Sequence, residues 1–457
     1  MNARVRISLL LLAVPLAASA QQLMTLLEAV SRSNATYPAI RSSIEQVGTA
    51  TEGINLARTA FLPRADFIGQ LNRATHNNVF GLMLPQTVIP TISGPALGTN
   101  SLSSVWGSAV GALVTWEPID FGLRKANVET AIAVREKAAA EVTVTRLQVG
   151  IATADAFLTL AAAEQTIVAA RSGVERARVL SEVIGTLAKN ELRPGADASR
   201  SQAELALARN LLIQAEQSRD VARAALAQLL PADPEAVAIN ATAVLGPPPP
   251  VAELPPANAA RHPLALANEA AVAEVKAREK ALNRSYYPRL YLQGAQYARG
   301  TGITHDGRIG GQASGLGPNT QNWALGASIT FPAFDFFSIR ARKGIEAHNE
   351  GSAEARYAQT LQDLTGQIEK AKAVLDGARR VAENTPIQLS AARATEQQAT
   401  ARYRAGLANI TEVAEAERLL TQAEIDDSLA RLGVWRALLG VAAAEGDLTP
   451  FLTTVTK

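Results

Sequence analysis

Two carboxylates in the C-terminal part of the chain have the type and spacing that chemistry requires. Glu412 and Glu415 are three residues apart in a segment with helical periodicity, so both lie on one face of a helix. Like charges held close together raise each other's pKa and attract cations. The alternative is a solvated helix face, where charged residues are normal.

Residues suited to catalysis are scarce in the sequence. The chain has no cysteine, which excludes disulfides, thiolate metal sites, a cysteine nucleophile and a lipid-modified N-terminal cysteine. Its four histidines are not paired at the spacing of metal ligands, and no Gly-x-Ser-x-Gly motif is present. We therefore predict that the protein is not an enzyme and uses neither a metal nor a cofactor.

The first 20 residues are typical of a secretory signal peptide. Arg4 and Arg6 precede an apolar run, and Ala18-Ser19-Ala20 is a small-residue cleavage site. These two arginines account for the whole excess of 44 basic over 42 acidic residues, so the exported chain is neutral and nucleic acid is not an expected partner. No later stretch offers roughly 18 consecutive apolar residues. If the protein crosses a membrane, it does so with strands.

The exported chain contains two copies of one sequence repeat. Pro63-Arg64 recurs as Pro288-Arg289, and Arg193-Pro-Gly195 recurs as Arg404-Ala-Gly406. The copies are joined by a proline-rich segment that cannot form a continuous helix. We expect a signal peptide at 1–20, a first repeat at 21–230, a linker or small side domain at 231–258 and a second repeat at 259–457.

Long stretches of each repeat space their apolar residues alternately three and four apart, which is typical of coiled-coil helices. We expect one long helix from about 121 to 193 and another from about 336 to 405, each followed by a return helix. An opening helix is expected from about 23 to 58. Pro386 lies inside the second long helix and should kink it. Where the long helices reverse, glycine would supply the left-handed conformation of the turn, at Gly195 and Gly406.

Between the helices the apolar period becomes two. Trp323, Leu325 and Ile329 alternate with small or polar residues, which is typical of a strand with one lipid-facing side. Hairpins are expected at about 61–116 and 287–331. A soluble sheet is the alternative interpretation of four such strands.

Four strands cannot close a membrane barrel, because known barrels begin at about eight strands and open edges are not tolerated in lipid. A barrel built from these hairpins would therefore be shared among several chains. The loops at 76–103 and 299–321 are long enough for the extracellular side. Amphipathic aromatic residues would lie at the membrane interface, at Trp106, Trp116 and Trp323.

Acidic residues open the two long helices. Asp120 follows Pro118 and Asp335 follows Pro332, at the points where a strand runs into a helix. Each aspartate is expected to accept backbone N–H bonds as a helix cap. An arginine four or five residues further on is a candidate to pair with it or to contact lipid head groups, at Arg124 and Arg340.

These features, in this order and in duplicate, resemble the TolC-type outer membrane efflux protein family of tripartite efflux and type I secretion systems. The resemblance covers essentially the whole exported chain. It rests on Trp116-Glu-Pro-Ile-Asp-Phe-Gly-Leu-Arg124, Arg193-Pro-Gly-Ala-Asp197, Tyr403-Arg-Ala-Gly-Leu-Ala-Asn-Ile410 and Trp435-Arg-Ala-Leu-Leu439 with Gly446-Asp447-Leu448. It implies an α+β, mainly α fold in which three chains share a twelve-stranded β-barrel that continues into an α-helical periplasmic tunnel.

The resemblance also implies the function. The protein would be a passive homotrimeric exit duct in the bacterial outer membrane, with a large periplasmic portion and contacts to outer-membrane lipid. A periplasmic adaptor and an inner-membrane transporter would open it at its periplasmic tip. Without an N-terminal cysteine, the barrel alone would anchor it. The alternative is a periplasmic coiled-coil adaptor or scaffold without a pore.

Individual residues take roles from the same resemblance. Glu412 and Glu415 match positions where related channels place acidic residues facing the lumen, so a trimer would hold stacked rings of three carboxylates. Tyr403 matches a tyrosine that helps to latch the entrance; its usual acidic partner aligns with Ser199, with Asp197 two residues away. The tips that would dock the adaptor contain Gly195, Asp197, Gly406 and Leu407.

Overall fold

The computed structural model describes residues 23–77, 97–98, 100–246, 249, 258–304 and 306–456. The predicted signal peptide, most of the loop expected at 76–103 and most of the segment 247–257 lie outside the described residues. The chain divides into two compact units. Described residues within Met1–Arg41, Thr145–His262 and Leu364–Lys457 form the helical unit, and those within Ser42–Val144 and Pro263–Asp363 form the sheet unit. Each unit contains segments of both sequence repeats.

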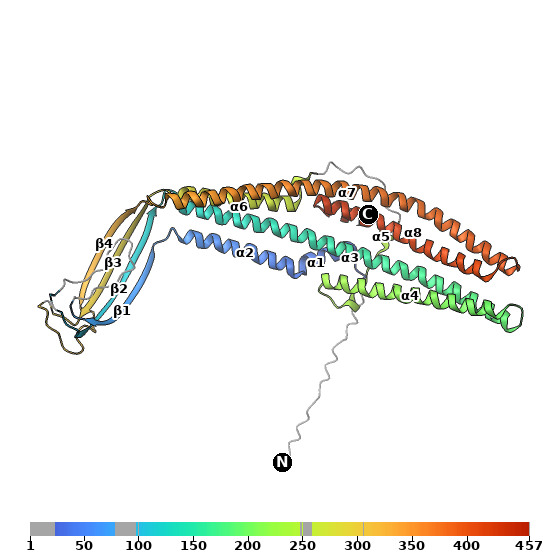
Figure 1. Ribbon diagram of the computed structural model, residues 1–457, viewed down its shortest axis with the longest axis horizontal. Helices are drawn as coiled ribbons and strands as arrows, with labels where there is room; N and C mark the ends of the chain where they lie inside the picture. Colours follow the sequence, from blue (N-terminus) through green and yellow to red (C-terminus); the bar gives the residue numbers. More distant parts are fainter. Residues whose placement is uncertain are drawn as a thin grey trace, which may run out of the picture. The chain divides into compact units, whose positions relative to one another are not determined.

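The sheet unit contains an antiparallel sheet of four strands in the order β1-β2-β3-β4 (Figure 1). The strands are β1 (Arg64–Thr75), β2 (Ser104–Ile119), β3 (Arg289–Thr301) and β4 (Thr320–Thr330). Both predicted hairpins are present, and pairing of β2 with β3 joins the two sequence repeats in one sheet. The register shifts between Trp116 and Ile119, where Pro118 has no N–H to donate.

One face of this sheet is apolar and exposed. Phe67 on β1 is 89% exposed, and Trp323 and Leu325 on β4 are 75% and 78% exposed. Polar residues occupy the half-buried positions between them, such as Asn72 and Asn322. The alternation predicted around Trp323 is confirmed in β4, and β1 has the same alternation.

The other face of the sheet holds a small core of Ala109, Leu113, Ala295 and Tyr297. Tyr297 on β3 is the register partner of Gly111 on β2. A Cβ at residue 111 would stand 2.4 Å from the Tyr297 Cβ and 2.7 Å from the carbonyl oxygen of residue 296. Because both neighbours are held by the ladder, glycine is required here for the two strands to pair.

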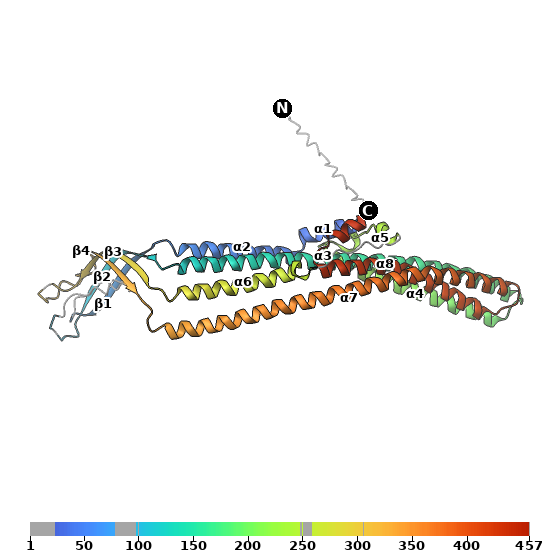
Figure 2. The same cartoon turned by 90° about the horizontal axis from the view of Figure 1, so that it is seen from above.

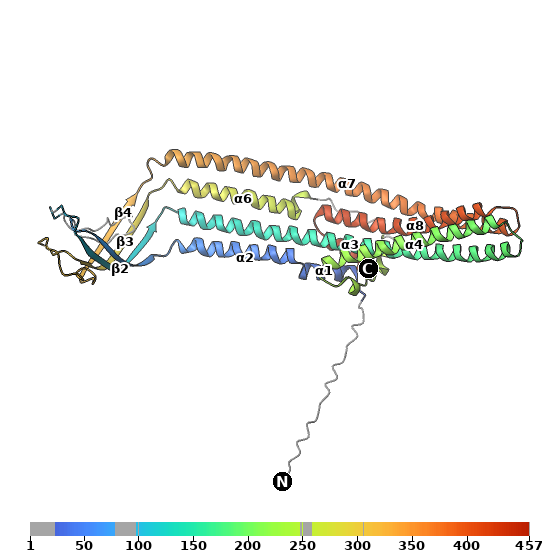
Figure 3. The same ribbon diagram turned by 60° about the horizontal axis from the view of Figure 1, so that its bottom comes forward.

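Each strand is continuous with a helix. Within the described chain, β1 follows α2 (Pro38–Thr59), β2 precedes α3 (Leu123–Lys189), β3 follows α6 (Pro263–Arg284) and β4 precedes α7 (Phe336–Arg404). In the sheet unit these helices lie side by side in the order of their strands (Figure 3). Ion pairs connect them: the Lys280 Nζ lies 2.6 Å from the Glu129 Oε2, and the Lys276 Nζ lies 2.9 Å from the Glu354 Oε1.

The helical unit contains α1 (Leu26–Thr36), α4 (Gly195–Leu229), α8 (Ile410–Glu445), α9 (Thr449–Thr456) and the C-terminal parts of α3 and α7. Three short helices complete it, namely η1 (Pro234–Ala236), α5 (Thr242–Leu245) and η2 (Ala259–Arg261). In this unit α9 packs against α1, α5 and α8, and Figure 2 shows α1 and α5 beside the C-terminal helix.

The core of the helical unit explains the most apolar part of α3. By length and composition alone α3 would be able to cross a membrane. Its residues Phe157, Leu158 and Leu160 are instead buried in a core with Leu226 of α4 and Trp435 of α8. Packing between helices therefore accounts for this apolar run.

Part of the segment expected as a linker belongs to that core. Val237, Ile239 and Val244 are buried in it. Met24 also pairs with Ile239 in a parallel β-bridge, which ties the start of the described chain to this segment. Residues 237–244 are thus packed into the helical unit.

The single opening helix expected from 23 to 58 is wrong. α1 ends at Thr36 and α2 begins at Pro38, and Tyr37 between them has extended backbone, with φ −68° and ψ 128°. The proline ring clashes with the preceding residue in helical geometry, so that residue is pushed out of the α region. His262 before Pro263 has the same conformation in the second repeat. By contrast, α7 continues past Pro386, and its expected kink stays a prediction.

Candidate gate at the helical turns and strand-to-helix junctions

The turn from α3 to α4 differs from the one predicted. Gly195 is the first residue of α4 and does not have a positive φ, so the expectation that it supplies the left-handed conformation is wrong. Glu191 has that conformation instead, with φ 58°. The amide of Leu192 then donates to the Leu187 carbonyl oxygen at 2.9 Å and closes the end of α3. Asp197 lies in the first turn of α4, where a negative charge stabilises the helix N-terminus.

At the turn from α7 to α8 the predicted glycine is confirmed. Gly406 has φ 75°, and the amide of Leu407 donates to the Arg402 carbonyl oxygen at 2.9 Å. This is the hydrogen-bond pattern of a helix that ends at a left-handed glycine. Asn409 then caps α8, because its Oδ1 accepts the amide of Glu412 at 3.0 Å.

The two turns meet at Tyr403. The Nη2 of Arg193, from the first turn, donates to the Tyr403 carbonyl oxygen at 2.8 Å. The same guanidinium lies over the Tyr403 ring, 4.6 Å from its centroid. The ring is buried with Ile184, Ile410 and Val413. The predicted latch tyrosine therefore joins the two turns of one chain, with Arg193 as a partner that sequence reasoning missed.

The Tyr403 hydroxyl is buried, and the Asp197 carboxylate is its acidic neighbour. Burial raises the pKa of this phenol, and the negative charge of Asp197 raises the pKa further. The nearest hint in the sequence was the arginine of Arg193-Pro-Gly195, which served only as a marker of the repeat.

The two candidate gate carboxylates each have a cationic neighbour. Glu412 lies 3.9 Å from an Nη of Arg402, and Glu415 lies 3.3 Å from an Nη of Arg418. Both side chains are exposed. The arginines are also exposed, so each pairing is weak and would leave the carboxylates free to act in an assembled ring.

The junction from β2 to α3 is a buried ion-pair network. The Asp120 Oδ1 accepts the amide of Gly122 at 3.1 Å, and its Oδ2 accepts both the amide and the Nε of Arg124. Arg124 also donates to the Ala60 carbonyl oxygen at 3.1 Å and covers the Phe61 ring. The predicted cap and its arginine partner are confirmed, and they tie the end of α2 to the start of α3.

The junction from β4 to α7 is built differently. The Asp335 carboxylate makes no hydrogen bond or ion pair within the described chain, so the predicted side-chain cap and its pairing with Arg340 are wrong. The backbone carbonyl of Asp335 still accepts the amide of Ile339 at 2.8 Å and so begins α7. Aromatic packing replaces the ion pair, with the Tyr286 and Phe336 ring centroids 5.8 Å apart just after Pro332.

The three candidate interface tryptophans differ in their surroundings. Trp323 stands free on the exposed face of β4. Trp116 donates its indole N–H to the Phe61 carbonyl oxygen at 3.1 Å, and the Arg73 guanidinium lies 5.2 Å from the Trp106 ring centroid. Trp116 and Trp323 expose ring surface in the way that an aqueous–lipid interface favours.

The described part of the chain contains no group of three His, Asp or Glu side chains arranged to hold a metal ion. Two histidines each have one ring nitrogen hydrogen-bonded to the backbone: His76 Nδ1 to the Ser103 carbonyl oxygen at 3.1 Å, and His262 Nε2 to the Ala443 carbonyl oxygen at 3.3 Å.

Known proteins share this sequence pattern and fold. A family model described as "Outer membrane efflux protein" matches residues 29–231 and 254–447. No curated protein sequence matches the chain. The structure is similar to the outer-membrane channel OprN, with 22% identity and a TM-score of 0.73 over 92% of this chain and 89% of that one.

Two further solved structures are similar. The CmeC outer membrane channel of Campylobacter jejuni has 15% identity and a TM-score of 0.72, over 94% of this chain and 89% of that chain. The open state of the MtrE outer membrane channel of Neisseria gonorrhoeae has 18% identity and a TM-score of 0.68, over 92% and 89% respectively. At these identities the likeness establishes the fold.

Proposed function

Because this chain belongs to the outer membrane efflux protein family, we propose that it is the outer-membrane channel of a tripartite efflux or secretion system. Three copies would share a twelve-stranded barrel that continues into an α-helical periplasmic tunnel. A periplasmic adaptor and an inner-membrane transporter would open this passive duct at its tip. The observation that carries the proposal is the four-stranded sheet, which has two open edges and an exposed apolar face.

The open edges support sharing of the barrel. β1 and β4 each have one strand neighbour within the described chain, so their outer N–H and C=O groups lack ladder partners there. In hydrocarbon, unpaired backbone groups cost several kcal/mol each, and only closure removes them. Pairing β1 of one copy with β4 of the next would close the sheet, and three copies supply twelve strands.

The exposed face supports an outer-membrane location for these strands. The exposure of large apolar side chains on this face, such as Phe67, Trp323 and Leu325, is unfavourable in water and matches a lipid-facing surface. In this proposal the signal peptide at 1–20 exports the chain and is removed. The barrel then anchors the protein without lipidation, since the sequence has no cysteine.

The helical turns would form the periplasmic tip. Leu407 is 71% exposed beside the left-handed Gly406, which suits an apolar docking contact with an adaptor. Gly195 and Asp197 would present the first turn to the same partner. In a trimer Glu412 and Glu415 would ring the entrance. We propose the repeats at 21–230 and 259–457 as the duplicated unit behind this arrangement.

Conductance and assembly test the proposal together. The purified chain in detergent should migrate as a trimer that dissociates on heating, and it should give single-channel currents in planar lipid bilayers. Replacing Glu412 and Glu415 together by glutamine should change the conductance or the preference for cations. A soluble monomer without currents would favour the alternative, a periplasmic scaffold without a pore.

A further inference from the structure

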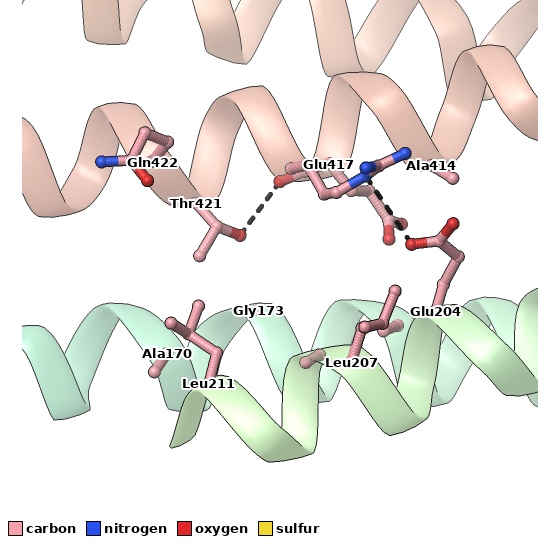
Figure 4. A pocket seen from close by; sticks show the side chains of 12 residues that line it. Ala170, Gly173, Glu204, Leu207, Leu211, Ala414, Glu417, Thr421 and Gln422 are labelled. Carbon is pink, nitrogen blue, oxygen red and sulfur yellow. Dashed lines mark hydrogen bonds and ion pairs between the residues drawn. The ribbon is translucent and has the colours of Figure 1, made fainter. Parts of the chain in front are cut away.

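A pocket of about 230 Å³ lies inside the helical unit, between α3, α4 and α8. Ala170 and Gly173 of α3 form its floor, Leu207 and Leu211 line it from α4, and Glu417 of α8 borders it. Figure 4 shows the Glu204 and Glu417 side chains pointing into the space between α4 and α8. The pocket therefore combines an apolar floor with two carboxylates.

Close packing of small residues shapes the pocket. A Cβ at Gly173 would stand 2.9 Å from the Thr421 Oγ1, so glycine lets α3 and α8 approach here. The Thr421 hydroxyl donates to the Glu417 carbonyl oxygen at 2.9 Å and accepts from Arg176 at 2.8 Å. These bonds fix the backbone that carries Glu417 without using its carboxylate.

The cations near the pocket are engaged with other carboxylates. Arg176 of α3 lies 3.0 Å from the Glu424 Oε2. Arg418 of α8 lies 3.7 Å from an Oε of Glu204 and 3.3 Å from one of Glu415. The Glu417 carboxylate has no ion pair and no hydrogen bond to any described residue. It is thus a half-buried acid at the wall of a pocket without a counter-ion in contact.

We propose that this pocket binds a small amphipathic monocation, such as a primary alkylammonium, with its ammonium on Glu417 and its hydrocarbon chain against Leu207 and Leu211. An ammonium would supply the counter-ion that Glu417 lacks, through charge-assisted hydrogen bonds. The hydrocarbon chain would cover leucine side chains that are now partly exposed. A neutral or anionic ligand of the same length would gain only the burial of its hydrocarbon chain.

The proton on Glu417 makes this binding dependent on pH. Burial raises the pKa of Glu417 to about 7, with Glu396 of α7 and Glu204 of α4 adding to the rise and Arg176 of α3 opposing it. Arg418 stands beside Glu417 on α8 but is engaged with Glu204 and Glu415. Below pH 7 the ligand must displace the proton, so its affinity should rise about tenfold per pH unit and level off above pH 7.

Calorimetric titration of the full chain in detergent tests the site. n-Hexylammonium chloride should bind saturably, with this pH profile between pH 5.5 and 8.5 and with release of protons near pH 7. n-Hexanol and hexanoate should bind at least about tenfold more weakly, since neither supplies a cationic donor for a hydrogen bond to the Glu417 carboxylate. These comparisons use the unchanged protein and so do not depend on the folding of a variant.

Variants locate the site. Glu417→Gln should lower the affinity for n-hexylammonium at pH 8 by at least about tenfold and remove the pH dependence. Glu383→Gln, at an exposed glutamate of α7 that does not line the pocket, is the matched control and should change neither. Leu207→Ser should weaken binding at every pH without changing the profile.

The proposal is overturned by an absence of saturable binding, by equal affinity for n-hexanol, or by a pH profile that survives in Glu417→Gln. Equal affinity for n-hexanol would identify an apolar crevice without a cation site. Binding requires neither a pore nor a trimer, so a protein that binds n-hexylammonium but gives no current would refute the duct while leaving this site in place.

Discussion

Arg193 should control how firmly the two helical turns hold together. Arg193→Ala removes a hydrogen bond from a charged donor to the Tyr403 carbonyl, worth about 1.5–3 kcal/mol. It also removes a cation–π contact worth about 0.5–1 kcal/mol. The equilibrium between joined and separated turns should therefore shift by at least about tenfold, because each 1.4 kcal/mol corresponds to a factor of about ten.

Electron spin resonance can measure this separation directly. The chain has no native cysteine, so spin labels attach only at Leu192→Cys and Leu407→Cys. Mixing the labelled chain with an excess of unlabelled chain before assembly isolates the distance between the two turns of one copy. Both positions are exposed. Arg193→Ala should lengthen and broaden the distance distribution, and in planar bilayers it should raise the fraction of time that the channel conducts.

Arg402→Ala is the matched control for Arg193→Ala. Arg402 contacts only its own turn among the described residues, with an Nη 3.3 Å from the Leu407 carbonyl oxygen and 3.9 Å from Glu412. Its removal should leave the distance between the turns unchanged. If Arg193→Ala behaves like Arg402→Ala in both assays, the turns are held by apolar packing alone and the latch does not operate.

Three further substitutions test the sheet, a junction and a buried acid. Gly111→Ala should lower the free energy of unfolding by about 1–3 kcal/mol in urea titrations. Gly69→Ala should leave it unchanged, because the added Cβ would meet open space. Equal effects of the two substitutions would refute the argument that Tyr297 lies across Gly111. Asp120→Ala should lower the free energy of unfolding by about 3–5 kcal/mol, because it leaves the buried Arg124 without its carboxylate partner. Asp335→Ala should change the free energy of unfolding by no more than about 0.5 kcal/mol. Because the folded pKa of Glu417 is raised to about 7, its contribution to stability falls as pH rises from about 4.5 to 7. Glu417→Gln should therefore raise the free energy of unfolding at pH 8 by about 1–3 kcal/mol, allowing for solvent screening, and should leave it unchanged at pH 4; a gain at both pH values would contradict the shift.

The hairpins were predictable because their signal is local. A period of two in Trp323, Leu325 and Ile329 identifies the exposed apolar side of the sheet from one strand alone. The pairing of β2 with β3 was not predictable in the same way. It joins residues almost two hundred positions apart, and its register depends on Tyr297 lying across Gly111, which no single strand reveals.

The residue type predicts the left-handed position in one of the two helical turns but not in the other. At Gly406 the left-handed position carries the residue that favours it, so sequence finds the turn and its conformation. At the first turn the same conformation falls on Glu191, and Gly195 simply begins the next helix. A glycine in a turn sequence therefore locates the turn, but the hydrogen bonds that close the preceding helix choose which residue becomes left-handed.

The acidic residues of α8 illustrate the remaining limit. Helical spacing places Glu412 and Glu415 on one face, but it does not say which faces of α8 are covered, because α3 and α4 come from the other repeat. Glu417 directly follows Ala416, a buried residue at an apolar position of the coiled-coil pattern. This neighbour was the only local sign in the sequence that Glu417 is partly buried. Its burial, and with it a pKa near neutrality, comes from helices about 200 residues away in the sequence. The acid whose pKa is raised to about 7 is thus one that the periodicity of its own helix does not distinguish.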